Sequence, residues 1–579
     1  MHVIATAGHV DHGKSTLIRA LTGMQPDRWA EERRRGMTID LGFAWTTLPS
    51  GEQIAFVDVP GHERFIANML AGVGAVPAVL FVVAADEGWM PQTDEHARAV
   101  AALPRARVAV VVTKCDLAPG EAVADDATRR LTALGLPPVA SAQVSAADGG
   151  GLDDVRRTLS ALAGALPPAE VAGPVRLWID RAFTIRGAGT VVTGTLPAGT
   201  MAIGDTLQLT PDGRDVVVRR LQSLQQDADQ VVAVARTAAN LRGVTREDVR
   251  RGMALVTPGA WSIADEFDVV VTGEAPGDRL VVHIGSAAVP ARVRRLAAGA
   301  ARVRLAHRLP LHAGDRLLLR DPATRRIAAA DVADLHPQPL RRRGAASVVA
   351  AGLSVPSGAD EEIDRRGVCS ADDLVAAGLT DEPRRARRVR ELWVSQSAWS
   401  DLSSRVSAAL EDTGSDGLPI AVVARHLGLA STDLVAALLE EQPDLVSVDG
   451  RVRRSGAQDE TQRDTQSEAC LRALQQRELF DPPSVADFAA AGISTADLAR
   501  AARAGSVLRL TPTVFLAADA ADRAIDVLST LAQPFTVSDA RVALGSTRRV
   551  VVPLLEHLDA TRRTRKHPDG TRFVVERPA

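Results

Sequence analysis

Tyrosine is absent from this chain of 579 residues, aromatic residues make up only 3%, and cysteine occurs three times. Cys115, Cys369 and Cys470 are far apart and form no CxxC pair, which argues against a disulfide framework and a cysteine-based zinc site. No apolar run is long enough to span a bilayer. The first residues, Met1 to Thr6, lead directly into a motif, so we expect no signal peptide. These absences favour a protein of the reducing cytoplasm, with no membrane partner.

Lysine is almost absent as well. Of 68 basic residues only Lys14, Lys114 and Lys566 are lysines, and the rest are arginines. Because arginine serves at nearly every basic position, a remaining lysine indicates a site that needs a compact ammonium group. The net charge of −3 points to no polyanionic partner by itself, and 46% hydrophobic residues are typical of a globular protein. The length predicts several domains, since single cores stop growing well below this size.

The first lysine lies in a phosphate-binding motif. Residues 8–15 read GHVDHGKS, the spacing GxxxxGK[ST], between a strand predicted from Val3 to Ala7 and a helix predicted from Ser15 to Leu21. In that setting the loop amides cradle the α- and β-phosphates. Lys14 then reaches the β- and γ-phosphates, and the Ser15 hydroxyl binds Mg²⁺. The predicted nucleotide-binding residues of this loop are Gly8, His9, Val10, Asp11, His12, Gly13, Lys14, Ser15 and Thr16.

A second predicted strand, Ile54 to Val57, ends at Asp58 and is followed by the sequence VPGH. An aspartate at the carboxyl end of a strand beside such a loop is placed to hold Mg²⁺. Gly61 can bring its backbone N–H close to the γ-phosphate because it has no Cβ. A third predicted strand spans Ala78 to Ala84.

A further strand, Val108 to Val112, leads into the sequence TKCD at residues 113–116. The Asp116 carboxylate can accept hydrogen bonds from guanine N1–H and the 2-amino group, a donor pair that adenine lacks, so the motif favours GTP over ATP. The Lys114 side chain is expected along the base plane. Thr113 stands where GTPases usually have asparagine, so it keeps a hydroxyl and loses an amide. After another short apolar segment, Ser145 and Ala146 can offer backbone N–H groups to guanine O6.

Together with the sequence RGMTI at residues 35–39, these segments resemble the five GTPase motifs of translation factors such as elongation factor Tu. The resemblance implies that Thr38 joins Ser15 and Asp58 as a Mg²⁺ ligand and senses the γ-phosphate. It also implies that His62 is catalytic and positions the attacking water once the ribosome docks. We therefore expect a GTPase that uses GTP and Mg²⁺ and is stimulated by the ribosome.

The run GMTIDLGF at residues 36–43 looks specifically like the bacterial type of selenocysteine-specific elongation factor. Alternating β-branched residues and glycines from Pro174 to Thr195 predict short barrel strands. They resemble the family's second domain, which cups the aminoacyl end of tRNA. Strand signals from Trp261 to Leu335 resemble the third domain, which grips the tRNA body.

The resemblance also implies an aminoacyl pocket formed by an Asp-Arg pair and a further arginine, and the matching residues here are Asp180, Arg181 and Arg236. A selenol is ionised at neutral pH, so both arginines would stabilise the selenolate, whereas a neutral seryl hydroxyl gains little from them. Asp180 would hold the guanidinium groups in place. An ordinary ion pair on the barrel surface is the alternative.

A basic linker from Leu340 to Gly344 opens a further stretch of about 240 residues with a weak internal repeat. Its clearest copy predicts three helices and a hairpin with an Asp-Gly turn, which describes a winged helix. The predicted elements of this copy are Leu402 to Leu410, Ile420 to Leu427, Ser431 to Glu441 and Leu445 to Val452. Further copies are expected at 462–516 and 519–576, with a degenerate one at 360–399. Selenocysteine-specific factors carry such winged helices.

The last copy is basic. Residues 540–579 hold nine Lys or Arg and four Asp or Glu, and the run STRR at 546–549 falls where a recognition helix would start. The run RRTRK at 562–566 falls in the strand that enters the wing. A solvated basic face is the alternative to nucleic-acid binding. We expect residues 519–579 to fold alone and to bind an mRNA hairpin through Arg548, Arg549, Arg562, Arg563, Arg565 and Lys566.

The predicted fold class is multidomain: an α/β P-loop GTPase domain, two β-barrels and an array of winged helices that is mainly α. The predicted ranges are 1–170, 171–258, 259–339, 340–400, 401–458, 459–518 and 519–579. The resemblance implies a cytoplasmic monomer that delivers selenocysteinyl-tRNA to the ribosome at UGA codons, guided by the mRNA hairpin. A general aminoacyl-tRNA carrier, the tRNA-binding subunit of an initiation factor or the GTPase partner of a sulfate-activating enzyme would leave the C-terminal part unexplained. A GTP-controlled DNA-binding regulator would leave the barrels unexplained.

Overall fold

The computed structural model describes residues 1–26, 38–74, 76–103, 106–187, 189–273, 277–410, 417–429, 431–454, 470–475 and 477–575. The chain divides into two compact units, Met1–Ser400 and Asp401–Ala579. The first unit contains the predicted GTPase domain, both barrels and the first winged-helix segment. The second unit contains the other three winged helices.

The GTPase domain has a six-stranded sheet in the order β2-β3-β1-β4-β5-β6, in which only β2 runs antiparallel to its neighbour. Its strands are β1 (His2–Ala7), β2 (Gly42–Thr47), β3 (Gln53–Asp58), β4 (Ala78–Ala84), β5 (Arg107–Thr113) and β6 (Ser141–Gln143). The central strands β1 and β4 are buried along almost their whole length, and β4 is apolar throughout, because helices cover both faces. Carboxyl ends of parallel strands meet at one edge, which brings the nucleotide motifs together.

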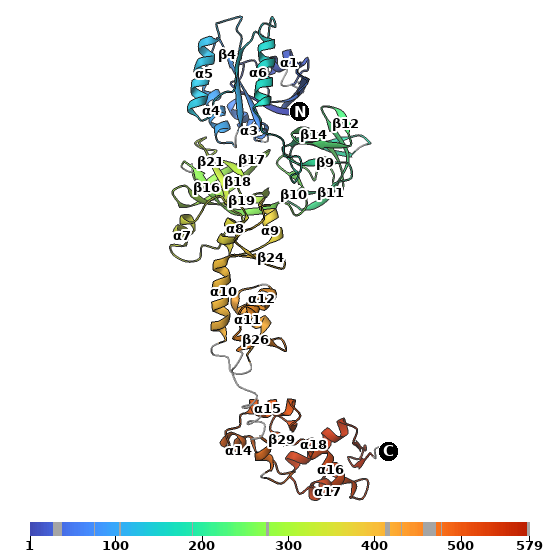
Figure 1. The fold of residues 1–579 in the computed structure, drawn as a ribbon. Coiled ribbons are helices and arrows are strands. Elements are labelled where there is room, and N and C mark those ends of the chain that lie inside the picture. The colour runs from blue at the N-terminus through green and yellow to red at the C-terminus, as the bar shows by residue number, and fades with distance from the viewer. Residues whose placement is uncertain are drawn as a thin grey trace. The chain divides into compact units, whose positions relative to one another are not determined.

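Two groups of helices cover this sheet (Figure 1). One apolar cluster contains residues of α3 (Ile66–Val73), α4 (Pro91–Ala101) and α5 (Glu121–Ala133). The other contains residues of α1 (Lys14–Thr22) and α6 (Leu152–Gly164). A single 3₁₀ turn, η1 (Glu63–Phe65), precedes α3. The helix and strands predicted around the motifs are confirmed, each within a residue or two of its observed bounds.

The second domain is a barrel that closes because β10 pairs with both β15 and β11. The ring runs through β10 (Thr206–Thr210), β15 (Ala254–Val256), β7 (Arg176–Ile185), β8 (Gly189–Leu196), β14 (Ala235–Arg242) and β11 (Arg214–Ser223). The short strand β12 (Gln226–Ala228) extends this sheet, and β9 (Thr200–Ala202) and β13 (Gln230–Val232) pair as a separate two-stranded sheet. Alternate residues of the ring fill its interior, as a half-buried barrel strand requires.

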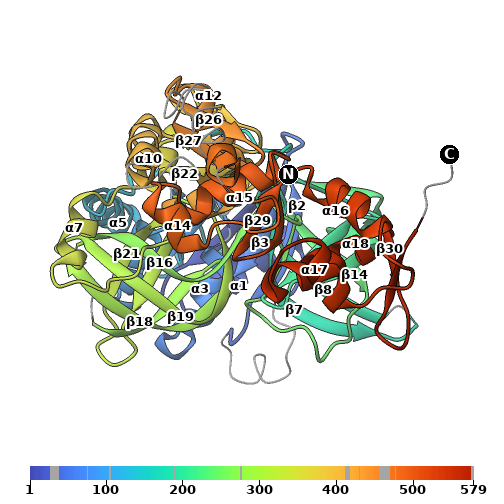
Figure 2. The same cartoon turned by 90° about the horizontal axis from the view of Figure 1, so that it is seen from below.

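The third domain is a closed barrel in the order β16-β19-β18-β17-β20-β21. Figure 2 looks onto β16, β18 and β19 of this barrel. Its strands are β16 (Ser262–Thr272), β17 (Arg279–Ile284), β18 (Ala287–Ala297), β19 (Ala300–Leu311), β20 (Arg316–Arg320) and β21 (Ile327–Asp334). The strand signals predicted from Trp261 to Leu335 are confirmed.

The first winged-helix segment is built onto this barrel. It contains α7 (Ala345–Ala351), α8 (Ala359–Arg366), β22 (Val368–Ser370), α9 (Ala371–Ala376), β23 (Arg387–Val389) and β24 (Leu392–Val394). Ile363 and Leu374 belong to the same apolar cluster as the barrel interior. The Ser262 hydroxyl donates to the Ala376 carbonyl at 3.0 Å, and the Ala313 N–H donates to the Ala377 carbonyl at 2.9 Å. The predicted segment 340–400 therefore shares its core with the third domain.

The second winged helix has the predicted three helices and hairpin. They are α10 (Gln396–Ala409), β25 (Leu418–Pro419), α11 (Ile420–Leu427), α12 (Asp433–Glu440), β26 (Leu445–Val448) and β27 (Arg451–Arg454). α10 begins six residues before the predicted Leu402 because Ser395 starts it: the Ser395 hydroxyl accepts from the Ala398 N–H at 3.2 Å. The predicted boundary between residues 400 and 401 therefore falls inside a helix. Asp449 and Gly450 have φ of 49° and 72°, as a tight hairpin turn requires.

The third and fourth winged helices share an apolar core. The third contains α14 (Val485–Ala490), α15 (Thr495–Arg503), β28 (Val507–Thr511) and β29 (Val514–Ala517), and its predicted start at Gln462 lies outside the described residues. The fourth contains α16 (Ala520–Ser529), α17 (Val537–Ala543), α18 (Arg548–Ala560), β30 (Thr564–Lys566) and β31 (Arg572–Val574). Phe480, Val514 and Leu516 complete the core around α16 to α18. Residues 519–579 alone would lack these side chains, and our expectation that this segment folds alone stays a prediction.

Candidate functional site

The phosphate-binding loop is closed by its own lysine. The Lys14 ammonium donates to the carbonyls of His9 at 2.6 Å and Gly8 at 3.2 Å, and α1 begins at Lys14 itself. Asp11 and Gly13 have φ of 63° and 78°, so the chain curls before it enters the helix. This is the geometry in which consecutive backbone N–H groups can surround an anion at a helix N-terminus.

Three oxygen ligands proposed for Mg²⁺ converge beside this loop. The Ser15 hydroxyl donates to Asp58 Oδ2 at 2.6 Å and lies 2.9 Å from the Thr38 hydroxyl. Thr6 fixes the other carboxylate oxygen of Asp58 by donating to Oδ1 at 2.8 Å. One carboxylate and two hydroxyls are hard oxygen donors of the kind that Mg²⁺ prefers, so the residues present fit the ion.

Gly61 lies against the phosphate-binding loop. A Cβ at this position would be 2.5 Å from both the Lys14 ammonium and the Val10 amide nitrogen, so only glycine fits. Next to it, His62 Nδ1 accepts from the Arg64 N–H at 3.2 Å, and the His62 ring centroid lies 6.0 Å from that of Phe65. The predicted motif residues Arg35, Gly36 and Met37 lie outside the described residues.

The side of the site predicted to bind guanine is braced by the threonine that replaces asparagine. The Thr113 hydroxyl donates to the His12 carbonyl at 2.7 Å, so it ties the end of β5 to the phosphate-binding loop. The Lys114 ammonium lies 2.8 Å from Glu87 Oε1 and 3.2 Å from Asp86 Oδ2. Asp116 is exposed. The Cys115 N–H donates to the Val144 carbonyl at 3.3 Å, which brings the predicted base-binding segments at 113–116 and 145–146 side by side.

Two residues for which the sequence predicted no role support this loop. The buried His96 on α4 accepts from the Gly8 N–H through Nδ1 at 3.2 Å, and burial lowers the pKa of His96 to about 3, so its ring is neutral. Glu87 lies 3.8 Å from His12 Nε2 and also pairs with Lys114. His96 lies on the buried face of α4, together with Thr93 and Ala97. A histidine at such a helical position is the sequence signal from which its role could have been predicted.

A pocket of about 450 Å³ lies between β2 of the GTPase domain and the second-domain barrel. Arg236 and Arg181 both line it, with their guanidinium carbons 4.0 Å and 5.2 Å from the centroid of the Phe43 ring. The buried Asp180 pairs with Arg236 and accepts from the Thr193 hydroxyl at 2.7 Å. The structure therefore brings the three predicted pocket residues together, and it adds Phe43 and Thr193.

The local backbone explains why adjacent residues serve one pocket. Successive residues of a strand normally point to opposite faces. The pairing of β7 with β8 shifts register between Ile179 and Arg181, as a β-bulge does. Arg181 donates to the Leu41 carbonyl at 2.9 Å and lies 3.7 Å from Asp40.

The basic residues of the last winged helix differ in their exposure and in their ion pairing. Arg548 and Arg549 are exposed in the first turn of α18, where the prediction put the start of a recognition helix. Arg565 and Lys566 are exposed on β30, and Arg562 is exposed just before that strand. Arg563 pairs with Asp522 of α16 at 2.6 Å, so part of its charge is already balanced.

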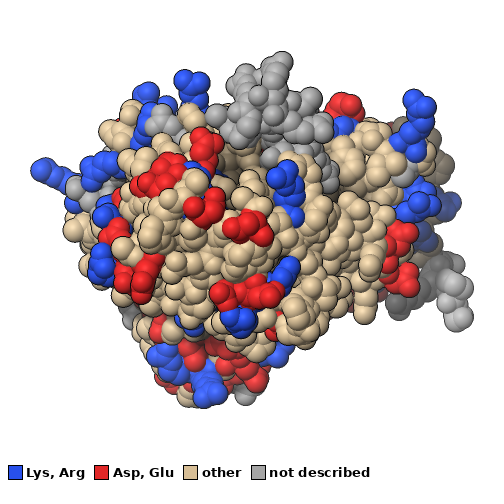
Figure 3. Space-filling model, turned by 90° about the horizontal axis from the view of Figure 1, so that it is seen from above, with Lys and Arg blue, Asp and Glu red and all other residues tan. Residues whose placement is uncertain are grey.

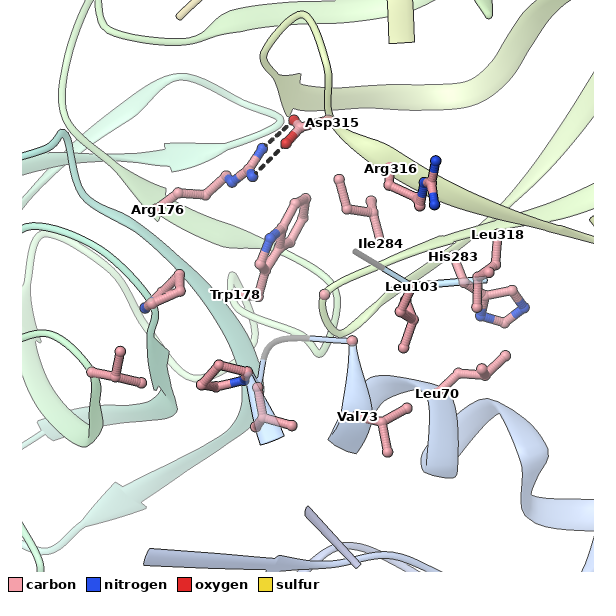
Figure 4. Close-up of a pocket in the computed structure, with 16 residues that line it drawn as sticks. Leu70, Val73, Leu103, Arg176, Trp178, His283, Ile284, Asp315, Arg316 and Leu318 are labelled. Atoms are coloured by element: carbon pink, nitrogen blue, oxygen red, sulfur yellow. Dashed lines mark hydrogen bonds and ion pairs between the residues drawn. The ribbon is translucent and has the colours of Figure 1, made fainter. Parts of the chain in front are cut away.

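A second pocket, of about 260 Å³, lies where the three domains of the first unit meet (Figure 4). Leu70 and Val73 of α3, Trp178 of β7 and Leu318 of β20 face it. Above it the Arg176 Nη2 donates to Asp315 Oδ1 at 2.8 Å, which joins the second domain to the third. The pocket is mainly apolar, and it marks a junction through which the domains of this unit contact one another.

On the face drawn in Figure 3, acidic and basic side chains are interspersed. Among the helices that the structure describes, none is long and apolar enough to cross a membrane.

Three known protein families match parts of the chain. The Elongation factor Tu GTP binding domain matches residues 1–167, Elongation factor Tu domain 2 matches residues 189–256, and the Elongation factor SelB winged helix matches residues 526–573. The first match ends close to the predicted limit of the GTPase domain, and the last lies on the basic winged helix.

Individual proteins are similar as well. The chain is 39% identical to the selenocysteine-specific elongation factor of Escherichia coli (strain K12) over 59% of this chain and 56% of that protein. It is 39% identical to the corresponding factor of Desulfomicrobium baculatum over 47% of this chain and 43% of that protein. The matched regions thus span about half the length of these relatives. A crystal structure of a bacterial selenocysteine-specific elongation factor superposes with a TM-score of 0.74 at 25% identity, covering 99% of this chain and all of that one.

Proposed function

This chain is a translational GTPase of the selenocysteine-specific elongation factor type, and on that premise we propose that it delivers selenocysteinyl-tRNA to the ribosome at UGA codons. It would act in the cytoplasm as a GTP·Mg²⁺ complex, guided by a hairpin in the mRNA. Each part of this proposal corresponds to one region of the chain.

The first region supplies GTP hydrolysis. Gly8 to Thr16 would hold the phosphates, while Asp116 would select guanine and Ser145 and Ala146 would meet its O6 through their backbone N–H groups. Ser15, Thr38 and Asp58 would hold Mg²⁺, which neutralises charge on the β- and γ-phosphates when bound. His62 would orient the attacking water when the ribosome docks. His62 directly follows Gly61 in the sequence, and Gly61 contacts the phosphate-binding loop. This adjacency supports the assignment.

The observation that carries the choice of substrate is the pair of arginines in one pocket. Arg181 and Arg236 both lie near the Phe43 ring and line the same space, with Asp180 holding Arg236. Two cations beside an aromatic wall favour a small, soft anion over a neutral hydroxyl. A selenolate is such an anion, and the oxygen of a seryl group is not. A general carrier of aminoacyl-tRNA has no need of this charge.

The C-terminal winged helix supports an RNA partner. Arg548 and Arg549 are exposed in the first turn of α18, where the helix dipole disfavours cations, and a phosphate of a bound nucleic acid would offset that cost. The barrels, in contrast, have no role in a DNA-binding regulator. Recognition of A-form RNA would centre on loop or bulge nucleotides, with these arginines on the flanking phosphates.

Binding of two tRNAs tests the proposal. Arg236→Ala should weaken binding of selenocysteinyl-tRNA by roughly 1.5 to 3 kcal/mol, the usual loss for a hydrogen bond to a charged group. Binding of seryl-tRNA to the same variant should change little. Arg219→Ala, on the second-domain strand β11 and outside the pocket lining, is the matched control. Equal losses for the two tRNAs would show that Arg236 contacts something other than the selenolate.

A further inference from the structure

The segment that carries the Mg²⁺ ligand Thr38 also carries contacts to the second-domain barrel. Asp40 Oδ1 lies 3.0 Å from Arg251 Nη2, and Asp40 Oδ2 lies 3.7 Å from Arg181 Nη2. Asp40 therefore faces two arginines of the neighbouring domain, one of which lines the aminoacyl pocket.

Arg251 contacts a second part of the GTPase domain. Its Nη1 donates to Asn68 Oδ1 at 3.0 Å, and Asn68 Nδ2 donates to the Ile39 carbonyl at 2.9 Å. Asn68 belongs to α3, the helix that follows His62 and η1. One barrel arginine thus joins both GTPase segments that adjoin the proposed γ-phosphate position.

The pocket arginine depends on the same segment. Besides its approach to Asp40, Arg181 donates to the Leu41 carbonyl at 2.9 Å, and its guanidinium carbon lies 5.2 Å from the Phe43 ring centroid. Residues two apart lie at most about 7 Å from each other along an extended chain. Asp40 follows Thr38 by two residues and Leu41 by three, so a large displacement of Thr38 from Ser15 would move both residues and break their contacts to Arg181.

We infer that Asp40 is a positioning residue that couples the nucleotide state to the aminoacyl pocket, with Arg251 as its partner. This inference rests on the proposed function, because it concerns the affinity of the same pocket for selenocysteinyl-tRNA. When Thr38 is held at Mg²⁺ and the γ-phosphate, Asp40 fixes Arg181 over Phe43 and the pocket is formed. When Thr38 is released, the arginine loses its support and the tRNA binds more weakly.

The test compares affinities for selenocysteinyl-tRNA with GDP and with a GTP analogue that is not hydrolysed, using the full chain. Asp40→Asn and Arg251→Gln should each weaken binding in the GTP-analogue state and leave the GDP state nearly unchanged. The ratio of the two affinities should fall at least about fivefold, the lower end of typical coupling between sites. By linkage, the effect of the tRNA on GTP-analogue affinity should fall by the same factor.

Two further variants test whether the change in the affinity ratio is specific to the Asp40–Arg251 contact. The double variant Asp40→Asn/Arg251→Gln should lose less than the sum of the two single variants, because both changes break the Asp40–Arg251 contact, while each also removes one contact of its own. Asp331→Asn removes a similar ion pair, 2.7 Å from Arg316 on the third-domain barrel, and should leave the ratio unchanged. Arg251 lies outside the pocket lining, so its variant keeps the inference testable if Asp40→Asn folds poorly.

Equal losses in both nucleotide states would make Asp40 a structural residue only and would overturn the inference. An unchanged ratio in both single variants would overturn it as well, and so would a wild-type chain whose tRNA affinity ignores the nucleotide. If the wild-type chain responds to the nucleotide but binds seryl-tRNA and selenocysteinyl-tRNA equally, the proposed substrate fails. The coupling through Asp40 is then tested by the same ratio of tRNA affinities with the GTP analogue and with GDP.

Discussion

At the scale of single residues, Thr113 shows how one functional group can be replaced while its task is kept. The substitution of asparagine by threonine removes an amide, yet the hydroxyl still reaches the His12 carbonyl at 2.7 Å. Gly13 stands next to this contact, since a Cβ there would lie 3.7 Å from the Thr113 hydroxyl. The shorter side chain therefore still braces the phosphate-binding loop from the end of β5.

We predict that Thr113→Val lowers the affinity for GTP and GDP alike. Valine has nearly the same shape, so the change leaves the buried His12 carbonyl without this donor, which costs about 1 to 3 kcal/mol. A tenfold loss in affinity corresponds to about 1.4 kcal/mol, and titration calorimetry with both nucleotides would detect it. Thr132→Val is the control, because its hydroxyl donates to the Thr128 carbonyl on the exposed face of α5. Unchanged affinity in Thr113→Val would show that the brace is dispensable.

At the scale of elements, the sequence predicts best those with a strong local pattern. The strand Ala78–Ala84 and the helix Ile420–Leu427 have the predicted bounds, because an unbroken apolar run and a clear helical period each specify the element locally. α10 was placed too late because its start depends on Ser395 and its apolar face includes Trp399, both before the recognised period.

Contacts between elements were harder to predict. Asp180, Arg181 and Arg236 lie together as the family resemblance implied, but Phe43 comes from another domain and no local pattern links it to them. The same is true of Phe480, whose side chain completes the core of α16 to α18. Such pairings are set by how domains pack, which periodicity and motif spacing do not report.

The basic elements of the last winged helix lead to a second prediction. Neutralising the exposed arginines and lysine should weaken binding of the full chain to the proposed mRNA hairpin and flatten the salt dependence by roughly one unit or less per charge. The variants are Arg548→Gln, Arg549→Gln, Arg565→Gln and Lys566→Gln. Arg563→Gln should have a smaller effect because Asp522 already pairs with that side chain at 2.6 Å.

Titrations at several salt concentrations, with the hairpin and with duplex DNA of equal length, measure this. Arg523→Gln is the control, since Arg523 lies on α16, outside the two basic runs, and pairs with Asp519. Equal affinity for hairpin and duplex would reduce this surface to nonspecific charge and favour the DNA-binding alternative.

At the scale of the whole molecule, the boundary between the two compact units falls at the predicted limit between residues 400 and 401, and each unit contains several predicted domains. The first winged-helix segment belongs to the unit Met1–Ser400, and its apolar residues complete the cluster of the third-domain barrel. The proposed GTP and tRNA sites thus lie in one unit that ends near residue 400, and the proposed mRNA contacts lie in the other. The division into units matches the division of proposed tasks better than the repeat pattern does.

We therefore predict that residues 1–400 bind GTP and selenocysteinyl-tRNA like the full chain and lose binding to the mRNA hairpin. Residues 1–339 should be less stable, since they expose the barrel surface that Ile363 and Leu374 cover. Losing two such side chains removes at least about 3 kcal/mol of burial, and urea unfolding of both fragments would measure the difference. Ile363→Ala within residues 1–400 tests the same contact without truncation and should cost about 2 to 5 kcal/mol, since this side chain is fully buried. If residues 1–339 unfolded at the same urea concentration as residues 1–400, the winged-helix segment would be an appendage, and the unit boundary would lie at the end of the second barrel.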